Sequence, residues 1–415
     1  MIDKPTGAVV QQGDRSGALS RCIAVDAATF AAEHWGRAPL LTRRAELTSD
    51  FADLLDPSAV DELVSRRGLR TPFVRMAKDG SVISADRYTR GGGAGATADD
   101  QVADDRVLDL LANGSTLVLQ ALHRTWPPLV SFGSALAGEL GHPVQINAYI
   151  TPPQSQGFAA HYDVHDVFVL QIAGRKQWHI HAPVLVEPLR DQPWDQRRAA
   201  VAAGAIEPPL IDVVLEPGDA LYLPRGYLHS ATALGEVSIH LTVGVHPHTR
   251  SHLVEHLMTA ARRDDALRAS LPMGVDLADP DVLAPHLRDT VAALHRWLDT
   301  ASATDVARFV GDELIRSTRP EPIGALAQLV AADSLDGSTR LRLRAALRWR
   351  QVRDADVVRI VLLDKTIALP ASCEPALKAV FAGEVLTPRE LPGLNADEQL
   401  VLFRRLLREG IVVPA

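Results

Sequence analysis

A histidine and aspartate pair and one distant histidine constrain the fold of this chain more than any other feature. His161 and Asp163 stand two residues apart, and His229 follows the turn-like segment 224–227 much later in the sequence. On an extended strand, residues i and i+2 point to the same side, so His161 and Asp163 can reach one ligand. A fold that closes over a long separation in sequence, as a β-barrel does, would bring His229 to the same place.

The segment 144–245 has the pattern of short strands separated by turns. Residues 144–150 alternate apolar and polar side chains with the period of two that marks a strand. Gly174 indicates a hairpin turn between two further strands. The expected strands are 144–150, 166–173, 176–180, 220–223 and 237–245. Such a series predicts an all-β sandwich or barrel, and the double-sheet jelly roll is the version that holds ligands in its mouth.

The ligand types at these positions favour a redox metal. Two histidines and one carboxylate form the facial triad of non-haem Fe(II) oxygenases, which leaves three coordination positions open. Three histidines would instead suit zinc. The pattern Pro-x-Gly-x-x-His at 224–229, after an apolar strand, is restrictive. We therefore predict that His161, Asp163 and His229 bind a metal and are not three unrelated surface residues.

Lys176 is the candidate for holding an anionic co-substrate beside the metal. It stands just after the expected Gly174 turn, so its side chain can project into the same barrel. A buried lysine needs an anion, and the distal carboxylate of 2-oxoglutarate would supply one. Tyr149 can add a hydroxyl group, and Asn147 lies on the same face of its strand. Without the triad beside it, Lys176 would be interpreted as an exposed lysine in a turn.

The composition indicates a globular chain of two or three domains. Its 415 residues exceed one ordinary core, and 47% hydrophobic with 23% charged residues is not the composition of a disordered chain. No apolar run reaches membrane-spanning length, and the N-terminus lacks a signal-peptide pattern. Cys22 and Cys373, the only two cysteines, are typical of free thiols in a reducing compartment. We therefore predict a cytoplasmic protein without a membrane partner.

The net charge of −8 bears on the choice of partner. A surface for nucleic acid would normally be basic, so we expect no direct nucleic-acid partner. An acidic chain favours association with a basic protein or peptide. Solubility alone would also account for the charge.

Four segments are expected along the chain. Residues 1–20 lack periodicity and predict a flexible tail. Residues 21–248 contain the strands, preceded by helical elements. Residues 249–320 hold three amphipathic helical patterns without an obvious core of their own. Residues 321–415 mix helical patterns with short strands, which suggests a winged-helix-like module.

Three further expectations concern parts of these segments. The glycine run 91–95 is typical of a surface loop, and a lid over the site is the alternative. In the last segment, residues 338–351 are expected to form a helix. The last segment has 8 basic and 9 acidic residues from Gln351 onward, which favours protein docking or a structural role over DNA binding.

The motifs together resemble the JmjC-type ribosomal oxygenases, which are cupin-like Fe(II)- and 2-oxoglutarate-dependent protein hydroxylases. The resemblance rests on Asn147 to Asp163, on Gly174 to Trp178 and on Tyr222 to His229, and outside the site on residues 30–40. It implies an α+β fold: a double-stranded β-helix (jelly-roll or cupin) JmjC domain, then a helical dimerisation domain and a winged-helix-like domain. A homodimer is therefore expected through residues 249–320.

The resemblance also implies roles for individual residues. His161, Asp163 and His229 would bind Fe(II), and Lys176 and Tyr149 would hold the 2-oxoglutarate carboxylate. Asn147 and Thr242 would line the co-substrate pocket. Nearby histidines are not assigned to iron, and a supporting role is considered only for His240. The neighbours left unassigned are His165, His179 and His181.

The expected function is hydroxylation of a histidine or arginine side chain of a ribosomal protein. The alternatives are the same chemistry on a peptide natural product or another protein, and a metal-binding cupin module without catalysis. A lysine demethylase is less favoured, because aromatic residues are only 5% of the chain and form no evident cage for a methylammonium group.

Overall fold

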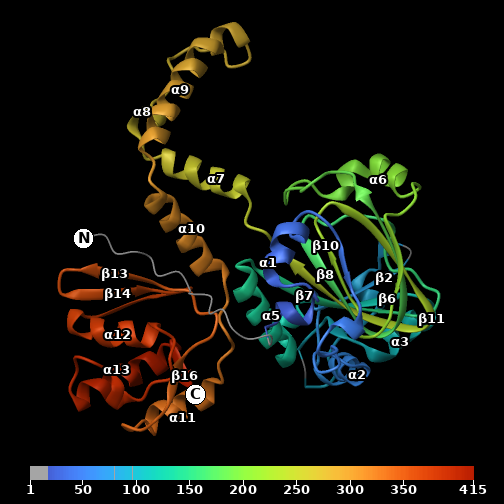
Figure 1. Ribbon diagram of the computed structural model, residues 1–415, viewed down its shortest axis with the longest axis horizontal. Coiled ribbons are helices and arrows are strands. Elements are labelled where there is room, and N and C mark those ends of the chain that lie inside the picture. Colours follow the sequence, from blue (N-terminus) through green and yellow to red (C-terminus); the bar gives the residue numbers. More distant parts are fainter. Residues whose placement is uncertain (1–16, 79, 96) are drawn as a thin grey trace. The chain divides into compact units, whose positions relative to one another are not determined.

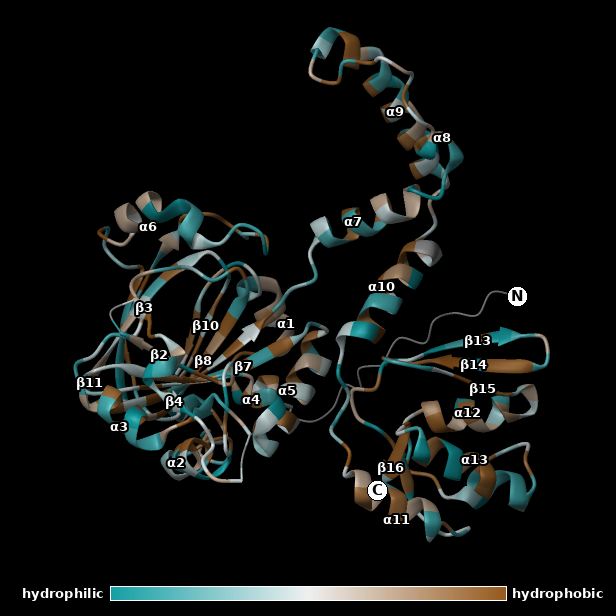
Figure 2. Ribbon diagram, turned by 180° about the vertical axis from the view of Figure 1, so that it is seen from behind, coloured by the Kyte–Doolittle hydropathy of each residue, from teal (hydrophilic) through white to brown (hydrophobic). Residues whose placement is uncertain are grey.

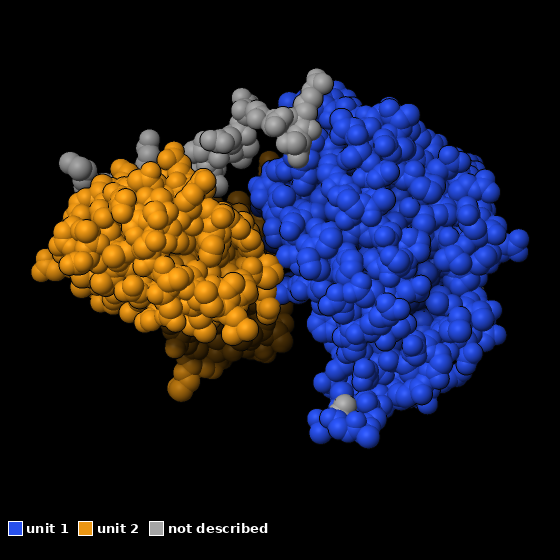
Figure 3. Space-filling model, turned by 90° about the horizontal axis from the view of Figure 1, so that it is seen from below, with its two compact units in different colours: residues 1–247 blue, residues 248–415 orange. Residues whose placement is uncertain are grey.

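The computed structural model of the protein describes residues 17–78, 80–95 and 97–415. The chain forms two compact units, residues 1–247 and 248–415, which Figure 3 shows in different colours. Each unit has its own hydrophobic core. Across the described residues, no helix combines the length and the apolar character needed to cross a lipid bilayer.

Unit 1 is built around one curved antiparallel sheet of nine strands (Figure 1). The strand order is β1-β10-β8-β11-β7-β6-β2-β3, and β9 pairs with β8. Some neighbours in this order, such as β1 with β10 and β7 with β11, are distant in sequence, as the closure of a jelly roll requires. The strands are β1 Leu40–Thr42, β2 Val74–Lys78, β3 Ser81–Val82, β6 Thr116–Leu119, β7 Val144–Thr151, β8 Asp166–Pro183, β9 Ile211–Leu215, β10 Ala220–Leu223 and β11 Tyr227–Val245.

The hairpin turn predicted at Gly174 is wrong, because β8 runs continuously through this residue. Gly174 has a φ of +61° and lies where the pairing of β8 with β11 skips residues 235–238 of β11. A Cβ atom on Gly174 would lie 2.2 Å from the carbonyl oxygen of Val237. Glycine therefore bends the strand at a bulge and does not reverse it. Lys176 consequently lies farther along the same strand, which pairs with β11 on both sides of the bend.

Helices pack on the sheet of unit 1 and complete its core. Phe30, Phe168 and Tyr222 form an aromatic cluster with ring centroids 4.9 to 5.9 Å apart, which joins the N-terminal helices to β8 and β10. The helical elements are η1 Leu19–Arg21, α1 Ala27–Thr29, η2 Phe30–His34, η3 Arg44–Glu46, α2 Pro57–Arg66, η4 Ala85–Arg87, α3 Asp104–Ala112, α4 Leu122–Thr125, α5 Pro127–Leu140, η5 Trp194–Arg197 and α6 Arg198–Gly204.

The predicted tail at residues 1–20 includes four described residues, 17–20. Residues 1–16 lie outside the described residues, and residues 17–20 are folded, so the tail prediction is wrong for these four. The Glu139 carboxylate accepts hydrogen bonds from the backbone N–H groups of Ala18, at 2.6 Å, and Leu19, at 3.0 Å. Both residues are buried, so a carboxylate on α5 ties this segment to the core.

The glycine run 91–95 joins two short paired strands, β4 Thr89–Arg90 and β5 Gln101–Val102. Gly93 and Gly95 have φ angles of +81° and +80°, and, chain neighbours apart, no atom of the described residues lies within 4 Å of the place of a Cβ. The run is therefore an open loop, as expected, and its role as a lid stays a hypothesis.

Unit 2 begins with helices and ends in a small mixed domain. The first helices are α7 Arg250–Ala261, α8 Asp265–Arg268, α9 Pro280–Thr300 and α10 Ala303–Ser317, and the later ones are α11 Ala325–Asp333, η6 Ala371–Cys373, α12 Glu374–Phe381, η7 Pro388–Glu390 and α13 Ala396–Arg408. The strands are β12 Leu341–Leu343, β13 Arg350–Asp354, β14 Val357–Val361, β15 Thr366–Pro370 and β16 Val412–Pro414. The division near residue 320 and the winged-helix-like character of the last part stay predictions.

The helix predicted at 338–351 is wrong. This stretch contains β12, an irregular connection and the start of β13. β12 pairs with the terminal strand β16, and β13 pairs with β14. Figure 2 shows β14 and β16 as largely hydrophobic and β13 as largely hydrophilic. Pairing of β12 with the distant β16, and of β13 with the next strand β14, outweighs the local helical tendency of this arginine- and leucine-rich stretch.

Candidate metal centre

A short backbone pairing holds the two halves of the predicted metal site together. His161 and His229 form an isolated β-bridge, in which each N–H donates to the other's carbonyl oxygen, at 3.2 and 2.9 Å. The Gly226 N–H donates to the carbonyl oxygen of Asp163 at 3.0 Å. His161 and Asp163 lie in an extended connection just before β8, and His229 is the third residue of β11. The main chain therefore fixes all three residues before any metal is bound.

The three side chains converge. One ligand atom from each of His161, Asp163 and His229 lies within 4.8 Å of the other two. His229 Nε2 is 3.7 Å from Asp163 Oδ2, and the two imidazole centroids are 4.5 Å apart. The structure thus brings together the three residues predicted from spacing, in an arrangement that fits one metal ion.

Backbone carbonyls hold the two imidazole rings in place. His161 Nδ1 is 2.7 Å from the Ala159 carbonyl oxygen, and His229 Nδ1 is 3.1 Å from that of Tyr227. A carbonyl can only accept, so each Nδ1 carries the proton and each Nε2 keeps its lone pair for a metal. This is the tautomer that a histidine ligand needs.

The ionisation of the site suits a cation. Burial, together with the neighbouring His161, lowers the pKa of His229 to about 4, so the His229 imidazole is neutral near pH 7. Burial by itself would raise the pKa of Asp163. The surrounding histidines, His165 foremost, hold that pKa below its usual value. A neutral imidazole and an ionised carboxylate are the forms that bind a divalent metal.

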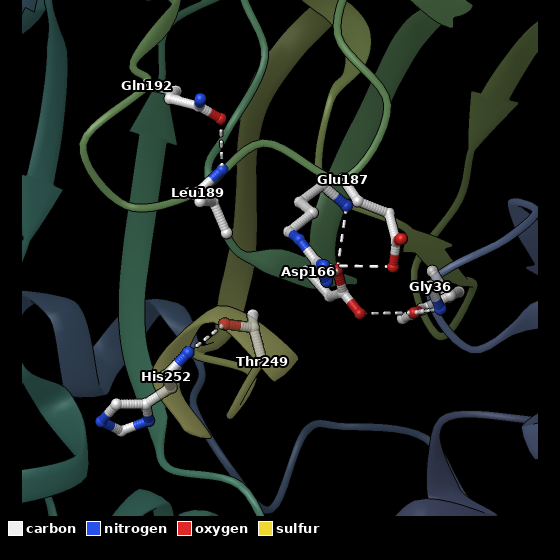
Figure 4. Close-up of polar contacts among 9 residues, drawn as sticks. Gly36, Asp166, Glu187, Leu189, Gln192, Thr249 and His252 are labelled. Carbon is white, nitrogen blue, oxygen red and sulfur yellow. Dashed lines mark hydrogen bonds and ion pairs between the residues drawn. The ribbon is translucent and has the colours of Figure 1, made fainter. Parts of the chain in front are cut away.

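The turn before His229 rests on a buried polar network (Figure 4). The carboxylate of Asp166, fully buried, accepts hydrogen bonds from the Tyr222 hydroxyl at 2.8 Å and from the Arg225 N–H at 2.9 Å. The Tyr222 hydroxyl in turn accepts from the Gly36 N–H at 2.9 Å. The Arg225 guanidinium pairs with Glu187 at 3.1 Å. These contacts position the segment that delivers His229.

Lys176 lines the same cavity as the triad. Its residue exposure is 4%, and its Nζ donates to the Thr151 hydroxyl at 3.0 Å. Within the described part of the chain, no carboxylate pairs with it, and burial lowers the pKa of Lys176 to about 7. A buried ammonium without a counter-ion is costly, so the cavity is complementary to an anionic ligand.

Aromatic rings flank this lysine. Tyr149 stacks on His240 with ring centroids 5.0 Å apart, and both side chains line the cavity. Burial raises the pKa of Tyr149 to about 12, so its hydroxyl stays neutral and able to donate. His240 Nδ1 is buried, and no hydrogen-bond partner for it is found in the described part of the chain; burial beside Lys176 lowers the pKa of His240 well below its usual value. Buried polar atoms of this kind are typical of a site that a ligand completes.

Of the two residues predicted to line the co-substrate pocket, Asn147 and Thr242, only one lines the cavity. Thr242 lines the cavity, whereas Asn147 does not, because its side-chain oxygen accepts the Ala121 N–H at 3.0 Å. The predicted co-substrate role of Asn147 therefore finds no support in this arrangement. Thr151 and Trp178 also line the cavity and escaped the sequence reasoning. Strand alternation from Tyr149 would have pointed to Thr151, two residues further along β7.

Comparison with known proteins agrees with this architecture. Residues 134–253 match the family model described as the JmjC domain. Ribosomal oxygenase 1 of Gallus gallus is 32% identical over 268 residues, covering 62% of this chain and 43% of that protein. The bifunctional lysine-specific demethylase and histidyl-hydroxylase NO66 of Culex quinquefasciatus is 26% identical over 298 residues, covering 69% of this chain and 44% of that protein. This chain spans less than half the length of these curated relatives.

Solved structures extend the likeness along the chain. The crystal structure of Escherichia coli ribosomal oxygenase YcfD has a TM-score of 0.54 at 18% identity and covers 94% of this chain and 98% of that one. A structure of YcfD with cobalt and 2-oxoglutarate has a TM-score of 0.51 at 17% identity, with the same coverage. At these identities the likeness concerns the fold. The predicted α+β architecture with a jelly-roll JmjC domain is confirmed, and so is the resemblance to JmjC-type ribosomal oxygenases.

Proposed function

We propose that this protein is an Fe(II)- and 2-oxoglutarate-dependent oxygenase that hydroxylates a histidine or arginine side chain of a ribosomal protein. The observation that carries the proposal is one cavity lined by His161, Asp163, His229 and the buried Lys176. Two imidazoles and a carboxylate suit Fe(II) with open positions, and the lysine suits an anionic co-substrate.

His161, Asp163 and His229 would hold the iron. When bound, iron would supply, with 2-oxoglutarate and O2 as co-substrates, the hydroxylation of an unactivated C–H bond: one atom of O2 enters that bond, the other enters succinate, and carbon dioxide is lost. The protein fixes the two imidazole tautomers through the carbonyls of Ala159 and Tyr227. The apolar lining, which includes Val167, Val169 and Leu223, limits water around the reacting atoms.

Lys176 and Tyr149 would bind the distal carboxylate of 2-oxoglutarate. The Lys176 ammonium would gain a counter-ion, which the described residues do not supply, and the Thr151 hydroxyl already orients its Nζ. The Tyr149 hydroxyl is a neutral donor at physiological pH. Thr242 lines the same cavity and supplies a further hydroxyl group.

A ribosomal protein as substrate is supported by the names of two similar proteins and by charge. The Gallus gallus relative and the Escherichia coli structural neighbour are both called ribosomal oxygenases. The net charge of −8 favours association with a basic chain. The choice between histidine and arginine rests on the resemblance. The name of the Culex quinquefasciatus relative also includes lysine-specific demethylation, so methyl-lysine is the second substrate class to test.

The helices of unit 2 support the proposed homodimer through residues 249–320. Two apolar residues four apart on one face of α9 are exposed in the single chain: Leu287 by 54% and Val291 by 44%. An exposed apolar face on a long helix is typical of an interface. Light scattering should find a dimer at micromolar concentration. A monomer there, or a dimer that persists unchanged in Leu287→Glu/Val291→Glu, would contradict this interface.

The test of the function is chemical. The full chain is incubated with Fe(II), 2-oxoglutarate and separated ribosomal proteins, and each protein is measured by intact mass. The expected result is one protein heavier by one oxygen atom, together with succinate, both lost in Asp163→Ala. A mass gain on a peptide natural product alone would select that alternative. Iron binding without any succinate would select the cupin module without catalysis.

A further inference from the structure

A second convergence of metal-binding side chains lies in unit 2. His252 and His256 are on α7, and Glu313 is on α10, a helix that packs against α7 (Figure 1). One ligand atom from each residue lies within 4.8 Å of the other two. The function proposed above makes no use of these residues.

His252 and His256 lie on the same face of α7, and both contact Glu313. Residues i and i+4 are neighbours on a helix surface, and the imidazole centroids of His252 and His256 are 4.8 Å apart. The Thr249 hydroxyl caps α7 by accepting the His252 N–H at 3.2 Å, which fixes the first turn that carries His252 (Figure 4). The sequence His252-Leu253-Val254-Glu255-His256 has the H-x-x-E-H spacing in which some zinc enzymes present two histidine ligands. We take only the ligand spacing from that parallel.

The contacts with Glu313 have the lengths expected of ligands around a small cation. His252 Nε2 lies 3.1 and 3.2 Å from the two carboxylate oxygens of Glu313. His256 Nε2 lies 2.7 Å from Oε2 without the alignment of a hydrogen bond, although that nitrogen is buried. Ligands bound to tetrahedral Zn²⁺ at about 2.0–2.1 Å are roughly 3.3 Å apart. A small outward adjustment would therefore admit the ion.

We propose that His252, His256 and Glu313 bind a divalent transition metal, and that Zn²⁺ is the ion they suit best. Two imidazoles and one carboxylate are an established zinc ligand set that leaves one position for water. The side chains are partly exposed, by 27%, 14% and 41% in the order His252, His256 and Glu313, so an ion can enter from solvent. The bound metal would fasten α10 to α7.

The experiment counts metal equivalents on the full chain without an affinity tag. The metal-free protein is titrated with Zn²⁺ against a chromophoric chelator. We expect two equivalents for the unaltered chain and one for His256→Ala. His161→Ala should also retain one equivalent, and the double variant none. The exposed His295 of α9 provides the matched control, and His295→Ala should keep both equivalents.

The outcomes separate this proposal from the function of unit 1. If His256→Ala and the milder Glu313→Gln both bind as much Zn²⁺ as the unaltered chain, the second site is refuted while the triad stands. If His161→Ala loses no metal, the triad fails and the second site stands. Replacing Zn²⁺ by Co²⁺ in His161→Ala should give the visible absorption of a tetrahedral ion, and its absence would also refute the site. Circular dichroism of each variant establishes that the helices persist.

Discussion

The two candidate metal sites use the same residue types on opposite kinds of scaffold. In unit 1, His161, Asp163 and His229 lie in a cavity, joined by a backbone bridge between extended segments. In unit 2, His252, His256 and Glu313 lie on two helices and stay partly exposed. Chemistry on oxygen needs open coordination positions in an enclosed space, whereas fastening two helices needs only ligands. The same ligand types can therefore serve different functions, depending on whether a cavity encloses the metal and on which other side chains line that cavity.

The largest expected effect is on the triad. His161→Ala or His229→Ala should abolish succinate formation because iron is lost, while the fold is retained. Metal analysis and circular dichroism of the purified variants measure both. His179→Ala is the matched control, since this histidine of β8 does not line the cavity and should leave turnover unchanged. Equal iron content in the unaltered protein and both triad variants would refute the assignment.

The lysine distinguishes an oxygenase cavity from a simple metal site. Lys176→Ala should keep iron but weaken 2-oxoglutarate binding, because one partner of a buried charge pair is removed. The cost is about 2–5 kcal/mol, or roughly thirtyfold to several thousandfold in Kd. Titration of the iron-free, Mn²⁺-loaded protein measures it. The exposed Lys78 provides the control variant Lys78→Ala, and an unchanged Kd in Lys176→Ala would contradict the role of this lysine.

The same lysine predicts a pH dependence. With a pKa of about 7 in the free protein, Lys176 is charged below that pH and neutral above it. Binding of an anion requires the charged form, so the Kd for 2-oxoglutarate should be flat below about pH 7 and rise about tenfold per pH unit above it. Lys176→Arg should remove this dependence, since arginine stays charged. A flat profile in the unaltered protein would show that Lys176 does not titrate in this range.

The smallest expected effect is on stability and concerns the N-cap of α7. Thr249→Ala removes the N-cap and should lower the free energy of unfolding of unit 2 by about 1 kcal/mol, with a parallel loss of Zn²⁺ affinity. Urea unfolding followed by helix content measures the first quantity. Thr259→Ala is the control, because its hydroxyl donates to the Glu255 carbonyl within the helix and caps nothing. If Thr249→Ala and Thr259→Ala have the same free energy of unfolding, the predicted contribution of the Thr249 cap to the stability of α7 is refuted.

Two errors of sequence interpretation have a common physical cause. Gly174 was expected to turn the chain, and it only bends β8, because its neighbour β11 continues alongside on both sides of the bend. Residues 338–351 were expected to be helical, and they pair with strands near the C-terminus and at 357–361. For β8 beside β11, and for β12 beside the terminal β16, the partner that decides the conformation is distant in the sequence.

From the sequence we predicted the three triad residues, the jelly-roll class and a place for Lys176 beside the triad, and the four side chains line one cavity, while their roles stay predictions. Spacing of two on an extended segment and a restrictive turn before His229 are local properties, so they can be read without coordinates. Three features became visible only in the tertiary structure: no carboxylate among the described residues pairs with Lys176, the Asn147 side chain accepts the Ala121 N–H, and Glu313 meets the α7 histidines. Each feature depends on which residues of separate helices and strands lie within contact distance of one another. The spacing of residues along the chain does not give these distances, because the packing of the elements sets which faces come together.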